Sequence, residues 1–210
     1  MVFARTPLIA SLALVAAGCS NATAATTTNA QPTTDPVVSV ANQGGSMEGH
    51  TPTGFAGMGT GLFVGDNLNP SFPEGQGVQT YLTFALPADL AISSGILISD
   101  VLTTTGTPFE DLGPLLAEAV EYPSFGPEVF DLRAAGIPVA CRVTGGSTVE
   151  CDVTVAVQDA IAHGRDTVQF RLRFERPADN DGQPDLAMFF RTDSNTNEAG
   201  LFNLLITQDQ

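Results

Sequence analysis

Residues 167–175 read TVQFRLRFE, and apolar and polar side chains alternate along the whole stretch. Successive side chains of a β-strand point to opposite faces, so this pattern predicts a strand with one buried face. The expected inward side chains are Val168, Phe170, Leu172 and Phe174. The stretch VQTYLTFAL at 78–86 repeats the pattern, although Thr80 interrupts its apolar face. Together the two stretches predict a sheet that packs on an apolar core.

Short strand patterns continue on both sides of this stretch. The further segments are SGILISDVL (94–102), LLAEAVEY (115–122), STVECDVTV (147–155), LAMFFRT (186–192) and LFNLLIT (201–207). Clusters of Gly, Pro, Asn and Asp separate them, and these residues favour turns. Many short strands with turn signals and almost no helix predict an all-β fold, an antiparallel β-sandwich or jelly roll.

One short helix is expected between two of these strands. Thr154 can cap a helix that begins near Val155, and Gly164 can end it after His163. An apolar pair at i, i+4 spacing inside it would pack on the sheet. His163 would then lie in the last helical turn, where the helix dipole favours a histidine without any catalytic role.

Cys141 and Cys151 are the ends of the segment CRVTGGSTVEC. A three-residue loop at 145–147 would make a hairpin in which the two cysteines face each other. In a non-hydrogen-bonded pair the Cα atoms approach to about 4.5 Å, which a disulfide accepts. The segment therefore predicts a disulfide, which would contribute about 2.8 kcal/mol of stability. Two buried free thiols are the alternative, and a metal site would lack histidine partners.

The N-terminal residues have the pattern of an export signal. Residues 1–18 combine a basic start, an apolar stretch too short to span a bilayer, and small residues at the end. The Ala-Ala-Gly before Cys19 resembles a bacterial lipobox, which implies cleavage before Cys19 and lipidation of its thiol. Ser20 in the next position indicates the bacterial outer membrane, with the lipid as anchor. An ordinary signal peptide that leaves Cys19 free is the alternative.

Composition restricts the partners of this chain. Its 210 residues carry a net charge of −15 and include no lysine, which argues against nucleic acid as a partner. Residues 19–52 are rich in Thr, Ala, Asn, Pro and Gly and lack apolar periodicity, so we expect a lipidated flexible linker there. Residues 53–210 suffice for one β-sandwich domain.

Several segments in order resemble secreted bacterial domains of the DNRLRE type, which are carbohydrate-binding-module-like jelly rolls. The resemblance covers about residues 58–207 and implies a non-catalytic sandwich. Ala85 and Gly95 replace the usual Asp and Ala, and Ala160 lies where many members carry Trp. The segments are LFVGDN (62–67), YLTFALPADLAISSGILISDVL (81–102), GTPFEDLGPL (106–115), DVTVAVQDAIAHGRDTVQFRLRF (152–174) and DNDGQPDLAMFFRT (179–192).

Catalytic and metal-binding motifs are scarce. The sequence contains none of the G-x-S-x-G, H-E-x-x-H or P-loop patterns, so we expect that the protein is not an enzyme. Asp179, Asp181 and Asp185 in the segment DNDGQPD provide hard oxygen ligands of the kind that calcium prefers. The spacing of a complete calcium loop is missing. The sequence therefore favours an exposed acidic turn, with calcium as the alternative and no other cofactor.

Aromatic residues decide how well a sugar-binding role fits. Sugar-binding surfaces use exposed rings, but the chain has no Trp and two Tyr. Tyr81 is expected to face away from the core and is the candidate for stacking on a ligand. We expect a lipid-anchored, non-catalytic envelope β-sandwich with a structural or adhesion role. Its expected partners are the membrane, through the lipid, and an envelope polymer or protein. The alternative function is a carbohydrate- or polymer-binding module, assisted by calcium.

Overall fold

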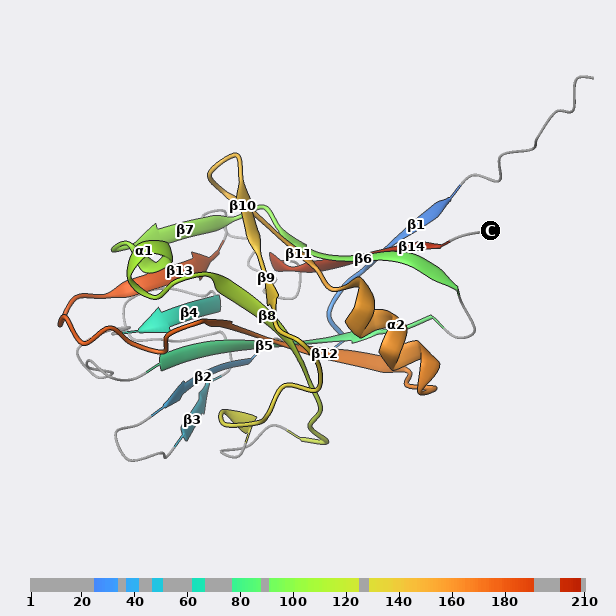
Figure 1. Cartoon of the computed structure of the whole chain (residues 1–210), viewed down its shortest axis with the longest axis horizontal. Coiled ribbons are helices and arrows are strands. Elements are labelled where there is room, and N and C mark those ends of the chain that lie inside the picture. Colours follow the sequence, from blue (N-terminus) through green and yellow to red (C-terminus); the bar gives the residue numbers. More distant parts are fainter. Residues whose placement is uncertain are drawn as a thin grey trace, which may run out of the picture.

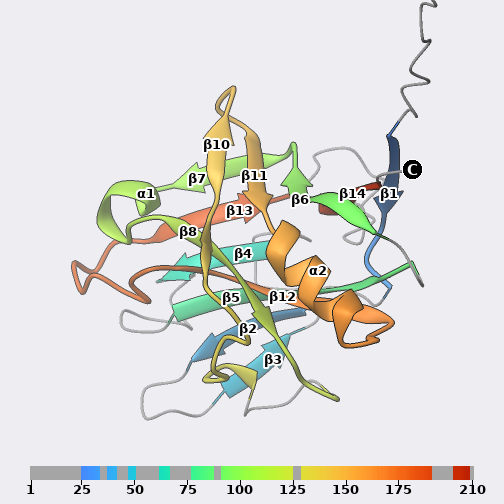
Figure 2. The same ribbon diagram turned by 45° about the vertical axis from the view of Figure 1, so that its right-hand side comes forward.

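The computed structural model describes residues 25–33, 37–41, 47–50, 62–66, 77–87, 91–124, 129–190 and 201–208. Two antiparallel β-sheets pack face to face in this part of the chain (Figures 1 and 2). The predicted all-β sandwich is therefore confirmed. None of the helices in the described residues has the length and apolar content needed to cross a bilayer.

The smaller sheet has five strands. Its order is β1 (Thr26–Ala30), β14 (Asn203–Gln208), β6 (Ile92–Ser99), β11 (Thr148–Asp152) and β10 (Arg142–Thr144). All neighbours in it are antiparallel, and the first and last described strands of the chain lie side by side in it.

The larger sheet follows the order β7, β13, β4, β5, β12, β8, β9. In addition, β2 pairs with β5, and β3 pairs with β2. β5 pairs with β12 along Thr80–Ala85, with β2 along residues 78–81 and with β4 at residues 77–78. The strand bounds are β2 (Val37–Ala41), β3 (Met47–His50), β4 (Leu62–Asp66), β5 (Gly77–Ala85), β7 (Leu102–Thr105), β8 (Leu115–Val120), β9 (Val139–Ala140), β12 (Thr167–Phe174) and β13 (Asp185–Phe189).

The core lies between the two sheets and is built from alternating strand positions. The four predicted inward residues of β12 are all buried in it. Thr80, which interrupts the apolar face of β5, is also buried and donates a hydrogen bond to the carbonyl oxygen of Phe63 at 2.9 Å. Its hydroxyl is thereby satisfied, which is what allows a polar residue at a core position.

The expected helix forms as α2 (Thr154–Ala162), with Gly164 in the left-handed region just after it. Thr154 does not cap this helix, because it is the first helical residue and its hydroxyl accepts a hydrogen bond from Gly95 N at 2.9 Å. A Cβ on Gly95 would lie 3.1 Å from the side chain of Val157, so glycine there lets the helix lie close to β6. A second, four-residue helix, α1 (Pro108–Asp111), was not predicted.

The cysteine hairpin forms as predicted. β10 and β11 pair Arg142 with Glu150 and Thr144 with Thr148, so residues 145–147 make the loop. Cys141 and Cys151 face each other with their Cα atoms 4.3 Å apart and are joined by a disulfide.

The N-terminal segment differs from its prediction. Residues 19–52 were expected to be a flexible linker, yet β1, β2 and β3 lie within them and pair with the domain. β1 pairs with β14 over five residues, and Thr33 N then donates to Thr83 O of β5 at 2.8 Å. The segment therefore connects both sheets, and the sandwich begins at Thr26 rather than at residue 53. Cys19 and residues 1–18 lie outside the described residues.

Candidate functional site

Tyr81, the predicted ligand-stacking residue, points away from the main core but is only 1 % exposed. Its hydroxyl lies 2.6 Å from Gln79 Oε1 and 3.1 Å from the carbonyl oxygen of Val129, and its ring meets Tyr122 edge-on. Burial raises the pKa of its hydroxyl. The expected open platform is therefore absent at Tyr81, because the segment that follows β8 covers this face of the sheet.

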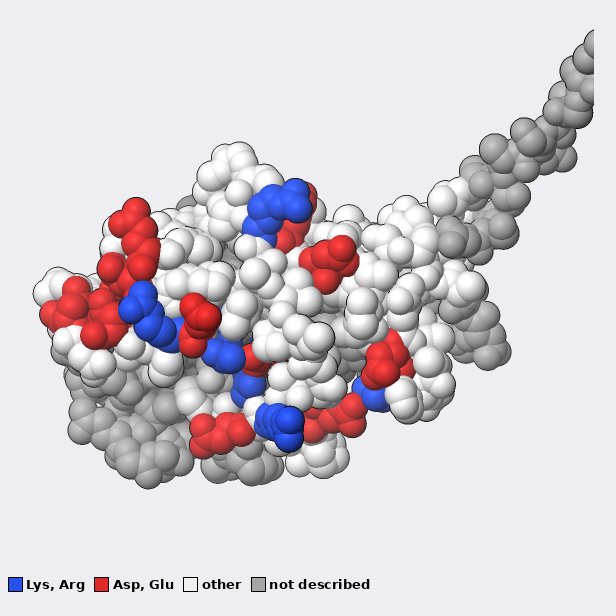
Figure 3. Space-filling model, in the orientation of Figure 1, with Lys and Arg blue, Asp and Glu red and all other residues white. Residues whose placement is uncertain are grey.

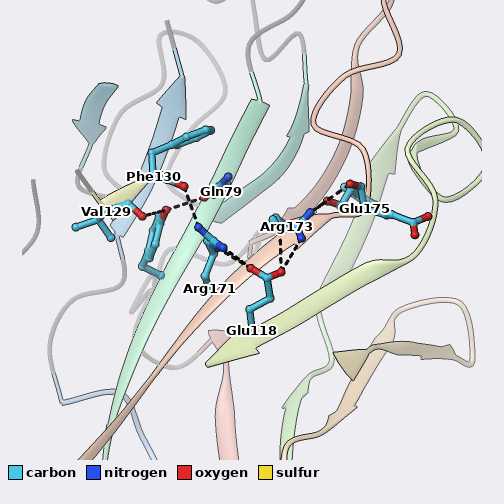
Figure 4. A network of polar contacts seen from close by, with 9 residues as sticks. Gln79, Glu118, Val129, Phe130, Arg171, Arg173 and Glu175 are labelled. Carbon is cyan, nitrogen blue, oxygen red and sulfur yellow. Dashed lines mark hydrogen bonds and ion pairs between the residues drawn. The ribbon is translucent and has the colours of Figure 1, made fainter. Parts of the chain in front are cut away.

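Glu118, Arg171 and Arg173 form a buried ion network (Figure 4). Arg171 lies opposite Tyr81 in the pairing of β12 with β5, so the network lies beside Tyr81 on the same outer face. Glu118 of β8 is 2 % exposed and accepts hydrogen bonds from Arg171 Nε at 2.8 Å and from Arg173 Nη2 at 2.6 Å. Burial alone would raise the pKa of Glu118, but the hydrogen bonds and charges of Arg173 and Arg171 outweigh it and lower the pKa. The carboxylate is thus held charged between two guanidinium groups.

This network fixes the segment that crosses the outer face. Arg171 Nη1 donates to the carbonyl oxygen of Phe130 at 2.8 Å, as Figure 4 shows. Val129 packs in a small apolar cluster with Tyr81. Ala135 N then donates to Ala119 O at 2.7 Å. Residues 129–135 are therefore held to the sheet by buried contacts, and the chain after them is positioned as one wall of a groove.

The groove lies between the end of β8, the residues before β9, the first turns of α2 and the start of β12. It has a volume of about 890 Å³, and we call it the β8–α2 groove. Its walls are formed by residues 119–123, 135–137, 139, 152, 153, 155, 156, 159, 165 and 167–169. This volume lies in the range of about 300–1,000 Å³ that is usual for ligand pockets.

The mouth of the groove is apolar. In the part of the chain that the structure describes, three large apolar side chains are exposed: Ile137 at 91 %, Val155 at 77 % and Val143 at 37 %. Ile137 and Val155 both line the groove. Apolar side chains gathered at a concave surface are typical of binding sites.

Charged groups surround this apolar surface. Arg165 pairs with Glu121 at 2.6 Å and with Asp159 at 3.2 Å. Asp152 accepts hydrogen bonds from the backbone N and the hydroxyl of Thr154. The three carboxylates and one guanidinium in the lining leave a formal charge of −2.

The acidic loop forms a second cluster at the other end of the molecule. Figure 3 shows acidic side chains gathered over α1 and the loop between β12 and β13. Carboxylate oxygens of Asp111, Asp179 and Asp185 lie within 4.8 Å of one another. Asp181 is outside this group and instead accepts a hydrogen bond from Gln183 N within its own turn. The structure thus brings together two of the three predicted residues and adds Asp111 of α1.

Asp185 is buried rather than exposed, which corrects the expected exposed turn at that position. Its Oδ1 accepts a hydrogen bond from Thr107 N at 2.6 Å. Gly106 has a φ of +67°, and a Cβ there would lie 2.3 Å from the Asp185 carboxylate. The close turn before α1 is therefore built around this side chain. The sequence does not show this, because the two segments are far apart in the chain.

Asp66 of β4 holds the backbone of this acidic loop and was not predicted from the sequence. Its carboxylate accepts hydrogen bonds from Asp179 N at 3.3 Å and from Asp185 N at 3.2 Å. Burial raises the pKa of Asp66 to about 6, although the two backbone hydrogen bonds act in the opposite direction. Burial likewise raises the pKa of Asp185. Hard oxygen atoms of this kind fit calcium. The carboxylates of Asp66, Asp179 and Asp185, however, already accept backbone hydrogen bonds that hold the loop in place.

The remaining residues of the groove and network were also missed, although some carried a signal. Glu118 is an acidic residue inside the apolar segment LLAEAVEY, and such a residue in a strand calls for a buried cationic partner. Ile137 stands alone between Gly and Pro and carried no periodic signal. Comparison with protein-family models and with curated proteins found no match for this chain.

Proposed function

We propose that this chain is a lipid-anchored, non-catalytic β-sandwich of the bacterial outer membrane that has a structural or adhesion role and binds its partner in the β8–α2 groove. The proposal rests on one observation. Ile137 and Val155 hold exposed apolar surface at the mouth of a groove with the volume of a ligand pocket.

The composition of the groove supports binding over chemistry. Its lining, as the structure describes it, includes no Ser, Cys, His or Lys, and its three carboxylates, Glu121, Asp152 and Asp159, all pair with Arg165 or Thr154. Arg165 is already paired with Glu121 and Asp159. The alternative of sugar binding loses its best candidate, because the ring of Tyr81 is buried.

The lipid anchor is supported by the small residues before Cys19. Expression of the full chain and of Cys19→Ala, followed by membrane fractionation and intact mass, tests this part. We expect a lipid-sized mass increment and outer-membrane location for the wild type only. Membrane association of Cys19→Ala, together with an unmodified wild type, would refute the anchor.

Co-sedimentation with isolated bacterial envelopes tests the binding part, with the mature chain carrying Cys19→Ala as the soluble form. We expect saturable binding that Ile137→Ser together with Val155→Ser weakens about tenfold or more, since each side chain contributes about 1.5–3 kcal/mol when buried. Val143→Ser is the matched control, because Val143 is exposed but lies outside the groove lining. Equal binding by all three proteins would contradict the proposal.

A further inference from the structure

We propose that the β8–α2 groove takes a cationic amphiphile, a molecule with an apolar body and a positively charged group such as an amine. This inference rests on the proposed function, which makes the groove a binding site, and adds the chemical class of its ligand. The apolar part of the argument comes from the groove walls, and the charged part from its rim.

Apolar side chains in the groove walls are exposed to solvent. Ile137 and Val155 stand at the mouth, and the buried residues Val153 and Val168 are also among those that line the groove. Gly136, which precedes Ile137 in the lining, has no atom within 4 Å of the position that a Cβ would occupy. An alkyl or aromatic body can therefore enter the groove and remove this surface from water, which supplies about 25 cal/mol per Å² buried.

The rim decides the sign of the ligand charge. Glu121, Asp152 and Asp159 outnumber Arg165, which gives the lining a charge of −2. Arg165 is not available as a separate anchor for an anion, because Glu121 and Asp159 lie on both sides of its guanidinium group. An anionic head group placed there would approach these two carboxylates and be repelled, whereas a cation would be attracted to them.

Two further features act in the same direction. Tyr122 contributes an aromatic side chain to the lining, and aromatic rings attract cations. The net charge of the whole chain is −15, which raises the average concentration of cations around the molecule. This second contribution is screened by salt, whereas attraction by the groove carboxylates at contact distance persists.

Three probes with closely similar unbranched chains test the assignment: decyltrimethylammonium, decanoate and decyl maltoside, all below micelle formation. Isothermal titration of the mature Cys19→Ala chain at moderate salt is the measurement. We expect single-site binding of decyltrimethylammonium, about tenfold tighter than that of decanoate, with the uncharged maltoside between them. Equal affinities, or tighter binding of decanoate, would overturn the inference.

Variants separate the two parts of the argument. Ile137→Ser with Val155→Ser should weaken all three probes, whereas the exposed control Val143→Ser should weaken none. Glu121→Gln with Asp159→Asn leaves Arg165 without acidic partners, so the preference should shift from the cation to decanoate. An unchanged preference would overturn the role of the rim. Thermal melts of each variant show whether the fold is retained.

The envelope assay makes the two failures distinguishable. Decyltrimethylammonium should displace the mature chain from envelopes, and decanoate should not. If the groove variants abolish envelope binding while decyltrimethylammonium neither binds nor displaces, the ligand class is wrong and the proposed function stands. If the groove variants leave envelope binding unchanged, both proposals fail together.

Discussion

Glu118 balances two arginine side chains at a position where water hardly reaches. Arg171 is 5 % exposed and Glu118 is 2 % exposed, so the pair has given up most of its hydration. Such a pair adds little stability over an apolar pair of the same shape, but loss of one member leaves an uncompensated buried charge. The same residues hold the segment 129–135 in place, so the network contributes to the shape of the groove wall.

Glu118→Gln is therefore expected to lower the free energy of unfolding by about 3–5 kcal/mol. Urea denaturation at pH 7 is the measurement. The matched control is Glu121→Gln, which makes the same chemical change in an exposed ion pair with Arg165 and should lower stability by less than about 1 kcal/mol. Similar losses in both variants would show that the buried network has no special role.

Asp66 gives a pH dependence of the opposite sign to that of an ordinary ion pair. Burial raises its pKa to about 6 in the folded protein, above the value in the unfolded chain. Its stability contribution is therefore complete below the unfolded pKa and is lost as the pH rises through 6. Glu118, whose pKa is lowered, behaves in reverse and loses its contribution as the pH falls below its usual range.

We expect the stability of the wild type relative to Asp66→Asn to fall by about 2 kcal/mol between pH 4 and pH 7, because Asn does not titrate. Urea titrations of both proteins at several pH values, with chelator present, are the measurement. A difference that stays constant or grows over this range would mean that the carboxyl of Asp66 is not the titrating group.

At the scale of elements, the β10–β11 hairpin shows what local sequence can determine. The loop, the register and the facing cysteines all follow from residues within eleven positions of one another. Loss of the disulfide frees the unfolded chain more than it alters the folded one. Replacement of both Cys141 and Cys151 by Ser should therefore cost about 2–3 kcal/mol while the fold is retained.

Differential scanning calorimetry of the double variant, beside wild type with and without reductant, checks this expectation. The circular dichroism spectrum serves as the control for the fold. Two alkylated cysteines in the unreduced, unfolded Cys19→Ala chain would contradict the disulfide, since no other cysteine then remains.

The loop between β12 and β13 should respond weakly to calcium, because the carboxylates of Asp179, Asp181 and Asp185 already accept backbone hydrogen bonds. Thermal melts in millimolar calcium and in chelator, at constant ionic strength, should agree closely. Saturation at 100 times the dissociation constant would instead add about 2.7 kcal/mol. Asp111→Asn and Asp181→Asn form the control pair, because only Asp111 lies in the cluster. A large calcium shift lost in Asp111→Asn alone would make this a calcium site.

Alternating polarity predicted β12, and the apolar spacing with Gly164 as a stop signal predicted α2, because both depend on neighbours in the chain. The burial of Tyr81 could not be predicted in the same way. It depends on residues 129–132, which are about 50 positions away and carry no strand or helix pattern. The groove likewise needs four separated segments. Residues 26–29 are polar and exposed and show no apolar periodicity, because β1 is an edge strand held by backbone pairing with β14.

At the scale of the whole molecule, the N-terminal segment joins the two sheets. A chain that begins at residue 25 should therefore be as stable as the mature chain, whereas one that begins at residue 34 should melt about 5 °C lower or more. Removal of β1 would also leave the edge of β14 unpaired, and exposed edges aggregate. Calorimetry and light scattering measure the two effects. Identical melting of both truncated chains would restore a linker role for residues 26–33.

The early start of β1 also bears on mechanics in the proposed lipid-anchored form. Only residues 20–25 separate Cys19 from Thr26, and at about 3.5 Å per residue the attachment reaches about 25 Å at most. The 33 residues between Cys19 and residue 53 would have reached about 115 Å. The domain would thus stay next to the bilayer surface, because only this short segment separates it from the lipid. Any tension between the lipid and a groove-bound partner would act on the chain at Thr26. It must separate β1 from β14 before the connection to the lipid can become longer.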